Sequence, residues 1–232
     1  MCAVLHPHKS RVANMPVITL ASGKGGVGKT LAVISLGAAL AAEGADVAIL
    51  DADPNKGAHR WATETYGGGK LTAYAEAETE RLAELVPQLA DRHDVLIADT
   101  AGFGNRSTVI CIGAADGVLI PATPGEGDIV EAQKMVAFVQ ATGRTIRRDI
   151  QVRVLANRIR RGTTLSRHLL SQIEVLGLPR LETTLSEAVA YGEMGFLPAL
   201  PAAGQAAAEI AALVTELLAL EWLPPITSRA NM

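Results

Sequence analysis

Short apolar runs alternate along the chain with longer stretches in which apolar residues recur at helical spacing. The short runs predict strands at 17–21, 47–51, 95–99, 117–121 and 151–157. The longer stretches predict helices at 29–43, 78–92, 125–142, 163–176 and 202–220. Alternation of this kind is typical of α/β folds, so we expect a doubly wound, mostly parallel sheet with helices on both faces.

Length and composition favour one domain with an aliphatic core. The chain has 232 residues, of which 49% are hydrophobic and only 3% aromatic. We expect a flexible lead-in over 1–15, a single domain over 16–222 and a loose tail over 223–232. Cys2 and Cys111 lack the spacing of a metal site or a disulfide framework, which favours a cytoplasmic protein. No apolar run reaches about 18 residues, so we expect no membrane span.

The turn between the first predicted strand and the first predicted helix carries the strongest chemical signal. It contains a complete G-x-x-x-x-G-K-[ST] phosphate loop, and its glycines let backbone N–H groups surround a phosphate at the helix N-terminus. Lys29 is expected to reach the β- and γ-phosphates, and the Thr30 hydroxyl to bind magnesium. The residues assigned to nucleotide binding are Gly23, Gly25, Gly26, Val27, Gly28, Lys29, Thr30 and Leu31.

Lys24 is an additional lysine within this loop. The nucleotide of the same chain needs only Lys29, so Lys24 is free to serve another partner. It either reaches a second subunit or is an ordinary solvated surface lysine.

Three aspartates follow predicted strands at the edge where the phosphate loop lies. Asp99 ends an apolar run as a Walker B aspartate does, and we expect its carboxylate to hold magnesium opposite Thr30. Asp51 and Asp53 are two residues apart and would project to the same side of an extended segment. We place Asp51 in the magnesium shell and Asp53 beside the attacking water. Asp53 and the following Pro54 are also compatible with a simple Asx turn.

Asn157 and Arg158 follow the fifth predicted strand, where a nucleotide base would lie. The Asn157 amide could pair with a purine edge or close a loop. A guanine-specific protein would usually show N-K-x-D here, whereas Arg160 stands at the aspartate position. The sequence therefore favours adenine, and we count Asn157 and Arg158 among the nucleotide-binding residues.

Arginines are concentrated in one stretch of a chain whose net charge is −3. Eight arginines and one acid, Asp149, occupy 144–167. Such a group would contact nucleic-acid phosphates without reading bases, or would form a solvated charged surface. The arginines assigned to DNA contact are Arg147, Arg148, Arg158, Arg160, Arg161 and Arg167.

Several motifs together resemble the ParA/MinD ATPases, which carry a deviant Walker A box. Residues 24–30 resemble that box, 51–55 resemble switch I, and 99–102 resemble switch II. Residues 183–191 resemble the late segment of small plasmid-type ParA proteins without an N-terminal helix-turn-helix. The similarity covers nearly the whole chain, although Asn55 stands where the family usually has glutamine.

The resemblance implies an ATPase that uses ATP and Mg²⁺ and forms a homodimer with two ATP molecules sandwiched between the subunits. Lys24 would reach the partner's nucleotide and act in catalysis with Lys29 and Asp53. ATP-bound dimers of such proteins bind duplex DNA nonspecifically, and a ParB-like or cargo adaptor protein stimulates a slow hydrolysis. The cycle positions a plasmid, a chromosome or a protein cargo on the nucleoid.

Other functions share the same loop. One alternative is a metabolic P-loop ATPase or kinase-like enzyme acting on a small molecule; another is a nucleotide-gated scaffold. A MinD-like positioning ATPase is a further alternative. Such proteins end in a basic amphipathic helix, whereas Pro224 and Pro225 interrupt the end of this chain. Iron–sulfur branches need several cysteines, which Cys111 alone cannot supply.

Overall fold

The computed structural model describes residues 16–102 and 104–225. The predicted lead-in over 1–15 and most of the predicted tail, 226–232, lie outside the described residues. In the described part, six strands form one parallel sheet with the order β3-β2-β4-β1-β5-β6. The strands are β1 (Val17–Leu20), β2 (Val47–Ala52), β3 (Leu71–Ala75), β4 (Val95–Thr100), β5 (Gly117–Ala122) and β6 (Gln151–Ala156).

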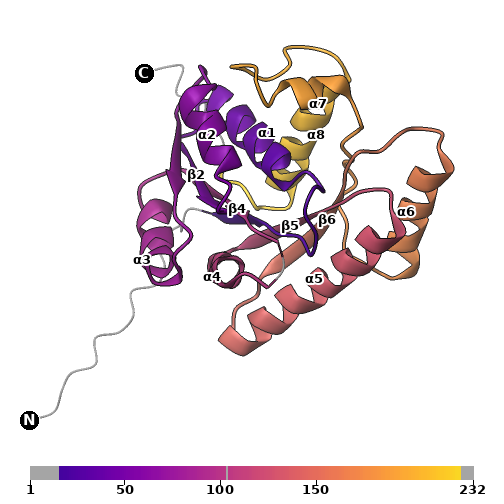
Figure 1. The fold of residues 1–232 in the computed structure, drawn as a ribbon, viewed down its shortest axis with the longest axis horizontal. Coiled ribbons are helices and arrows are strands. Elements are labelled where there is room, and N and C mark those ends of the chain that lie inside the picture. Colours follow the sequence, from indigo (N-terminus) through magenta and orange to yellow (C-terminus); the bar gives the residue numbers. More distant parts are fainter. Residues whose placement is uncertain (1–15, 103, 226–232) are drawn as a thin grey trace, which may run out of the picture.

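Helices cover both faces of this sheet (Figure 1). One face carries α1 (Lys29–Ala42), α2 (Gly57–Glu64), α7 (Val189–Glu193) and α8 (Gln205–Ala219). The other carries α3 (Thr79–Ala90), α4 (Arg106–Ala114), α5 (Glu126–Ile146) and α6 (Thr164–Val175). The predicted doubly wound α/β fold is confirmed.

All five predicted strands and all five predicted helices are present, but four elements of the described part were not predicted. The edge strand β3 has only intermediate or exposed positions, so its sequence lacks the apolar run of a central strand. The helices α2, α4 and α7 are short, with 8, 9 and 5 residues, too short for a clear periodic pattern. The predicted helix at 125–142 continues four residues further, to Ile146.

The predicted loose tail begins too early. Trp222 and Leu223 are each only 4% exposed and belong to the core under α1 and α8. A side chain at Gly117 would collide with the Trp222 ring, so β5 approaches the end of the domain closely. The domain therefore extends beyond residue 222.

The alternation of side chains along the central strands determines the face of the sheet to which the aspartates at the strand ends point. Ile49 and Ile97 pack in the core on the α1 face. Asp51 and Asp99 lie two residues further along the same strands and are register partners across β2 and β4. Successive residues of a strand point to opposite faces, so both carboxylates point to the α1 face, where the phosphate loop enters its helix.

Candidate nucleotide-binding site

The β1–α1 turn forms a glycine-rich loop that ends at the first residue of α1. Gly26 and Gly28 have positive φ angles of 79° and 91°, which side-chain-bearing residues rarely adopt. Gly28 is the N-cap of α1, so Lys29 and Thr30 form its first turn. The Lys29 Nζ donates a 2.9 Å hydrogen bond to Ser22 Oγ. Burial lowers the pKa of Lys29, while the charges of Asp99 and Asp53 act in the opposite direction.

Asn157 fastens the end of β6 to this loop. Its Nδ2 donates to the Val27 carbonyl at 2.8 Å, and its Oδ1 accepts the Arg158 backbone N–H at 2.9 Å. The side chain is buried, and a Cβ on Gly28 would come within 2.3 Å of Nδ2. The Asn157 amide thus closes and supports the loop. Nδ2 and Oδ1 each keep a second hydrogen-bonding position, so a purine contact by Asn157 stays a prediction.

Thr30 and Asp99 meet at the bottom of the loop. The Thr30 hydroxyl donates to Asp99 Oδ2 at 2.7 Å, whereas the buried Oδ1 has no hydrogen-bond partner among the described residues. Burial raises the pKa of Asp99 to about 7, and the neighbouring Asp51 charge adds to the increase. A buried carboxylate with a free oxygen beside a hydroxyl is suited to a hard cation.

Asp51 and Asp53 have different surroundings. Asp51 is 1% exposed and accepts backbone N–H groups from Asp53 and His59 at 3.0 and 2.9 Å. Burial nevertheless raises its pKa, because those hydrogen bonds offset only part of the desolvation. Asp53 is more exposed, and its Oδ1 accepts both the backbone N–H and the side-chain amide of Asn55. The predicted Asx turn is therefore present, with its carboxylate beside the loop.

The residues around Asp99 fit magnesium only as part of a nucleotide complex. Within 16–102 and 104–225, no group of three or more His, Cys, Asp or Glu is arranged to hold a metal by itself. Magnesium in phosphoryl-transfer sites is commonly held by one or two protein oxygens together with substrate phosphates. Thr30 and the free oxygen of Asp99 match that pattern, with Asp51 as the neighbouring register partner.

Lys24 bonds to a residue that the sequence did not reveal as part of the site. Its Nζ lies 2.5 Å from Asp128 Oδ1 on the first turn of α5, and Thr123 donates its hydroxyl to the other carboxylate oxygen. Ser22 donates to the Lys24 carbonyl at 2.7 Å and accepts from Lys29, so it links both lysines of the loop. Asp128 and Thr123 carry no motif signal, and only the β5–α5 turn brings them here.

The predicted arginine cluster is two groups. Arg147 and Arg148 precede β6, whereas Arg158, Arg160 and Arg161 follow it. Six residues of strand separate the groups by about 20 Å. Arg148 forms a 2.9 Å ion pair with Asp116, which precedes β5. Arg148 therefore lies at the amino ends of the strands, remote from the phosphate loop.

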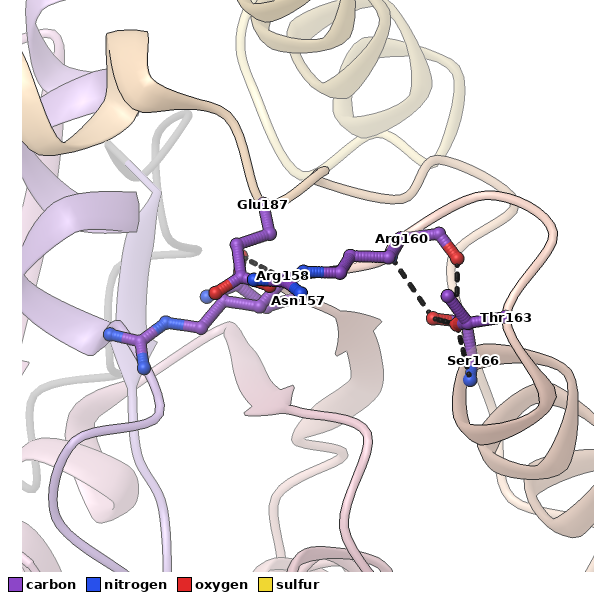
Figure 2. Close-up of polar contacts among 6 residues, drawn as sticks. All are labelled: Asn157, Arg158, Arg160, Thr163, Ser166 and Glu187. Carbon is purple, nitrogen blue, oxygen red and sulfur yellow. Dashed lines mark hydrogen bonds and ion pairs between the residues drawn. The ribbon is translucent and has the colours of Figure 1, made fainter.

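Only the second group lies at the edge of the nucleotide site. Figure 2 shows Arg160 reaching from the β6–α6 loop to Glu187, with Thr163 and Ser166 at the start of α6. The Arg158 side chain extends away from α6 in the same view. A pocket of about 290 Å³ lies beside these residues, and Thr123, Pro124 and Leu165 complete its lining. Arg167 follows on α6 and is exposed.

Among the described residues, no helix combines the length and the apolar character that crossing a membrane would require.

Comparisons with known proteins agree with this geometry. The sequence profile of the VirC1 protein family matches residues 15–217. The protein virC1 of Rhizobium rhizogenes is 31% identical over 186 residues, which cover 78% of this chain and 80% of that relative. A ParA protein of Rhizobium radiobacter is 32% identical over 136 residues, which cover 59% of this chain and only 61% of that relative.

Solved structures support the fold. The ATP complex of a Cyanothece McdA variant superimposes with a TM-score of 0.75 and 17% identity, covering 89% of this chain and 96% of that one. At this identity the likeness concerns the arrangement of strands and helices.

Proposed function

The chain belongs to the VirC1 protein family, within the ParA-type partition ATPases, and we propose that it is an ATP-dependent dimerising switch that positions a cargo on DNA. The observation that carries the proposal is the loop with two lysines in different environments. Lys29 is buried and its Nζ contacts Ser22 within the loop, and we assign it to the nucleotide of its own chain. Lys24 is 57% exposed at the mouth of the loop, where the nucleotide of a second subunit can approach.

Each site residue then has a separate task. The loop N–H groups and Lys29 bind the triphosphate, and Thr30, Asp99 and Asp51 supply the protein side of a magnesium site. When bound, magnesium neutralises charge that develops on the phosphate oxygens. Asp53 orients the attacking water, and the Asn55 contacts hold its carboxylate in place. Asn157 keeps the loop in its binding conformation through Val27.

If each Lys24 contacts the nucleotide of the other subunit, nucleotide binding is coupled to dimerisation. A lysine ammonium directed at a partner's phosphate makes a charge-assisted contact that exists only in the dimer with nucleotide bound. Hydrolysis and loss of the γ-phosphate remove part of that contact, so the dimer separates. A ParB-like or cargo adaptor protein would accelerate this step.

The division of the arginines supports placing the proposed DNA face at the phosphate-loop end of the strands. Arg158, Arg160, Arg161 and Arg167 lie on the same edge as the phosphate loop, so a dimer formed across that edge would combine two such groups into one basic surface. Arg147 and Arg148 lie near the opposite edge and would not contribute. We place the working protein in the cytoplasm, associated with the nucleoid.

Duplex DNA binding measured with ATP, ADP and no nucleotide tests the proposal. We expect binding only with ATP and Mg²⁺, with an affinity that falls steeply as salt increases. Cargo capture by a MinD-like or scaffold protein would instead be independent of DNA. Equal DNA affinity in all three nucleotide states would contradict the switch. Rapid turnover with a small-molecule acceptor, without DNA binding, would favour a metabolic enzyme.

A further inference from the structure

The arginines before β6 line a pocket that the proposed function does not use. Its volume is about 430 Å³, and its lining includes Arg144, Arg147 and Arg148. Arg148 is fixed, because its guanidinium donates to the Gly113 carbonyl and to Asp116, each at 2.9 Å. Arg144 and Arg147 are exposed, and neither forms an ion pair with any residue of 16–102 or 104–225. Two cationic side chains are thus available to an anionic ligand.

Arg147 occupies a backbone position that favours glycine. It follows the last residue of α5, and its φ of 56° and ψ of 41° lie in the left-handed region. The turn is closed by the backbone N–H groups of Arg147 and Arg148, which donate to the carbonyls of Arg144 and Gly143. The turn therefore does not depend on the Arg147 side chain, whereas the pocket does. A strained position that keeps a charged side chain supports a role in binding.

A second pocket borders the same turns of α5, where that helix ends beside α4 (Figure 1). Its volume is about 360 Å³, and its largely apolar lining includes Val86, Ile110, Ala114, Val109 and Ile146. Val109 and Ile146 are 43% and 42% exposed, so aliphatic surface is open to solvent here. Gly113 also lines this pocket, and its carbonyl accepts the hydrogen bond from Arg148. The apolar and the basic pocket therefore adjoin.

We propose that the last two turns of α5 form a docking site for a segment of a partner protein in which apolar side chains adjoin acidic ones. The apolar side chains would enter the pocket at Val109 and Ile146, and the carboxylates would pair with Arg144 and Arg147. The site lies at the amino ends of the strands, remote from the phosphate loop. The proposal therefore does not rest on the nucleotide switch, and a segment bound here leaves the proposed dimer and DNA faces uncovered.

The two pockets together fit a protein segment better than a nucleic acid. A guanidinium matches a carboxylate with two parallel hydrogen bonds, and arginine is enriched at protein interfaces. Duplex DNA would use the arginines but not the apolar pocket, and the exposed Asp149 in the basic lining would repel its phosphates. An α-helix is about 10–12 Å across, so about four extended residues reach from one pocket to the other.

The first experiment measures binding of a fluorescein-labelled peptide, two leucines followed by four glutamates, to the full chain by fluorescence anisotropy. We expect a dissociation constant below about 1 mM that is the same with ATP, ADP and no nucleotide. Replacing the leucines by glycine, or the glutamates by glutamine, should each weaken binding about tenfold. No binding, or equal affinity for the glutamine peptide, would overturn the proposal. Loss of ATP-dependent dimerisation or DNA binding would leave this result unaffected.

The second experiment places variants in the two pockets. Arg147→Gly should weaken peptide binding about fivefold without lowering the unfolding temperature, because glycine suits the left-handed position. Ile146→Ser should weaken binding of the leucine peptide about fivefold but leave that of the glycine peptide unchanged. The controls are Arg60→Ala on α2 and Val189→Ser on α7, two exposed residues on the other face of the sheet. Unchanged binding by Arg147→Gly, or equal losses in the controls, would contradict the site.

Photocrosslinking from position 109 identifies the occupant of the apolar pocket. With benzoylphenylalanine in place of Val109, we expect a cross-link to the leucine end of the peptide, which unlabelled peptide suppresses. A cross-link to residues 1–15 of the same chain or to a second copy, which the peptide does not displace, would assign the pocket to that occupant and overturn the proposal. Displacement of the peptide by duplex DNA from the nucleotide-free protein would overturn it as well, because the arginines would then serve phosphates.

Discussion

Thr30 Oγ1 donates a 2.7 Å hydrogen bond to Asp99 Oδ2, which joins the first turn of α1 to the end of β4. The two residues are separated by 69 positions in sequence, and the parallel pairing of β1 with β4 brings them together. The bond satisfies only one carboxylate oxygen. The other is buried with no partner in the part of the chain that the structure describes, so this pair is incomplete without a ligand.

The incomplete pair predicts that Asp99→Asn stabilises the nucleotide-free protein. The pKa of Asp99 is raised to about 7 in the folded state, above its usual unfolded value of about 3.9. Ionised Asp99 therefore destabilises the folded state: this cost is absent below about pH 4, increases as the pH rises and is complete above about pH 7. At pH 8 in EDTA, we expect Asp99→Asn to unfold at a higher temperature than wild type. Its free energy of unfolding should be larger by about 1–3 kcal/mol.

The same comparison at lower pH checks the cause. The difference between Asp99→Asn and wild type should shrink towards pH 5, and the variant should lose Mg²⁺-dependent ATP binding. Asp149→Asn is the control, because Asp149 is exposed and its substitution should not reproduce the stability gain of Asp99→Asn at pH 8. A stability difference that does not vary with pH would rule out burial of the Asp99 charge as the explanation.

The two lysines of the loop should separate nucleotide binding from dimerisation. Lys29→Ala removes the buried ammonium that reaches the phosphates, so calorimetry should detect no ATP binding. Lys24→Ala changes a more exposed side chain at the mouth of the loop and should leave ATP affinity within about threefold of wild type. Light scattering should then show a large loss of ATP-dependent dimer for Lys24→Ala. A normal dimer fraction would exclude a role for Lys24 across the interface.

Local patterns made most of this site predictable. Lys29 and Thr30 could be placed because the motif prescribes its own backbone geometry, and Asp99 because a buried strand ends there. The bond between Lys24 and Asp128 could not be predicted, since 104 positions separate them and the contact depends on where α5 begins. Backbone placement, rather than residue type, makes Asp128 part of the site.

The arginines illustrate the opposite error, since residues that are neighbours in sequence need not be neighbours in space. Arg148 and Arg158 are ten positions apart, but β6 runs between them, so they lie at opposite ends of that strand.

The Asn157 amide is a third case. The sequence leaves this amide between a purine contact and loop closure, and the structure shows a contact with Val27 that closes the loop. Side-chain partners of this kind depend on tertiary packing that a single sequence does not reveal.

The separation of the arginines provides a test of the DNA face, with two arginines before β6 as the control group. Reversing Arg158, Arg160 and Arg161 to glutamate should weaken duplex DNA binding with ATP by at least tenfold and reduce its salt dependence, because several phosphate contacts are lost. Reversing Arg144 and Arg147 places the same kind of charge change before β6, remote from the phosphate loop, and should have little effect. Electrophoretic mobility shift or fluorescence anisotropy over a salt series measures both. Equal losses from the two groups would indicate a general charge effect and contradict an oriented face.

Two glycines of the loop differ sharply in the space that a side chain would find. Gly28 has a φ of 91°, and a Cβ there would lie 2.3 Å from Asn157 Nδ2, whereas a Cβ on Gly25 meets nothing within 4 Å. Gly28→Ala should therefore destabilise the protein by about 1–3 kcal/mol and abolish ATP binding, because the loop must move away from Asn157. Gly25→Ala should leave the unfolding midpoint unchanged.

Combining Gly28→Ala with Asn157→Ala then identifies the physical cause. The second substitution removes the amide that the new methyl group would strike, but it leaves the backbone strain at residue 28 in place. Chemical denaturation should show the double variant to be more stable than the sum of the two single losses predicts, with part of the Gly28→Ala loss remaining. Strictly additive losses would mean that the loop and Asn157 are independent. That result would contradict the idea that the 2.8 Å bond from Asn157 to Val27 holds the loop.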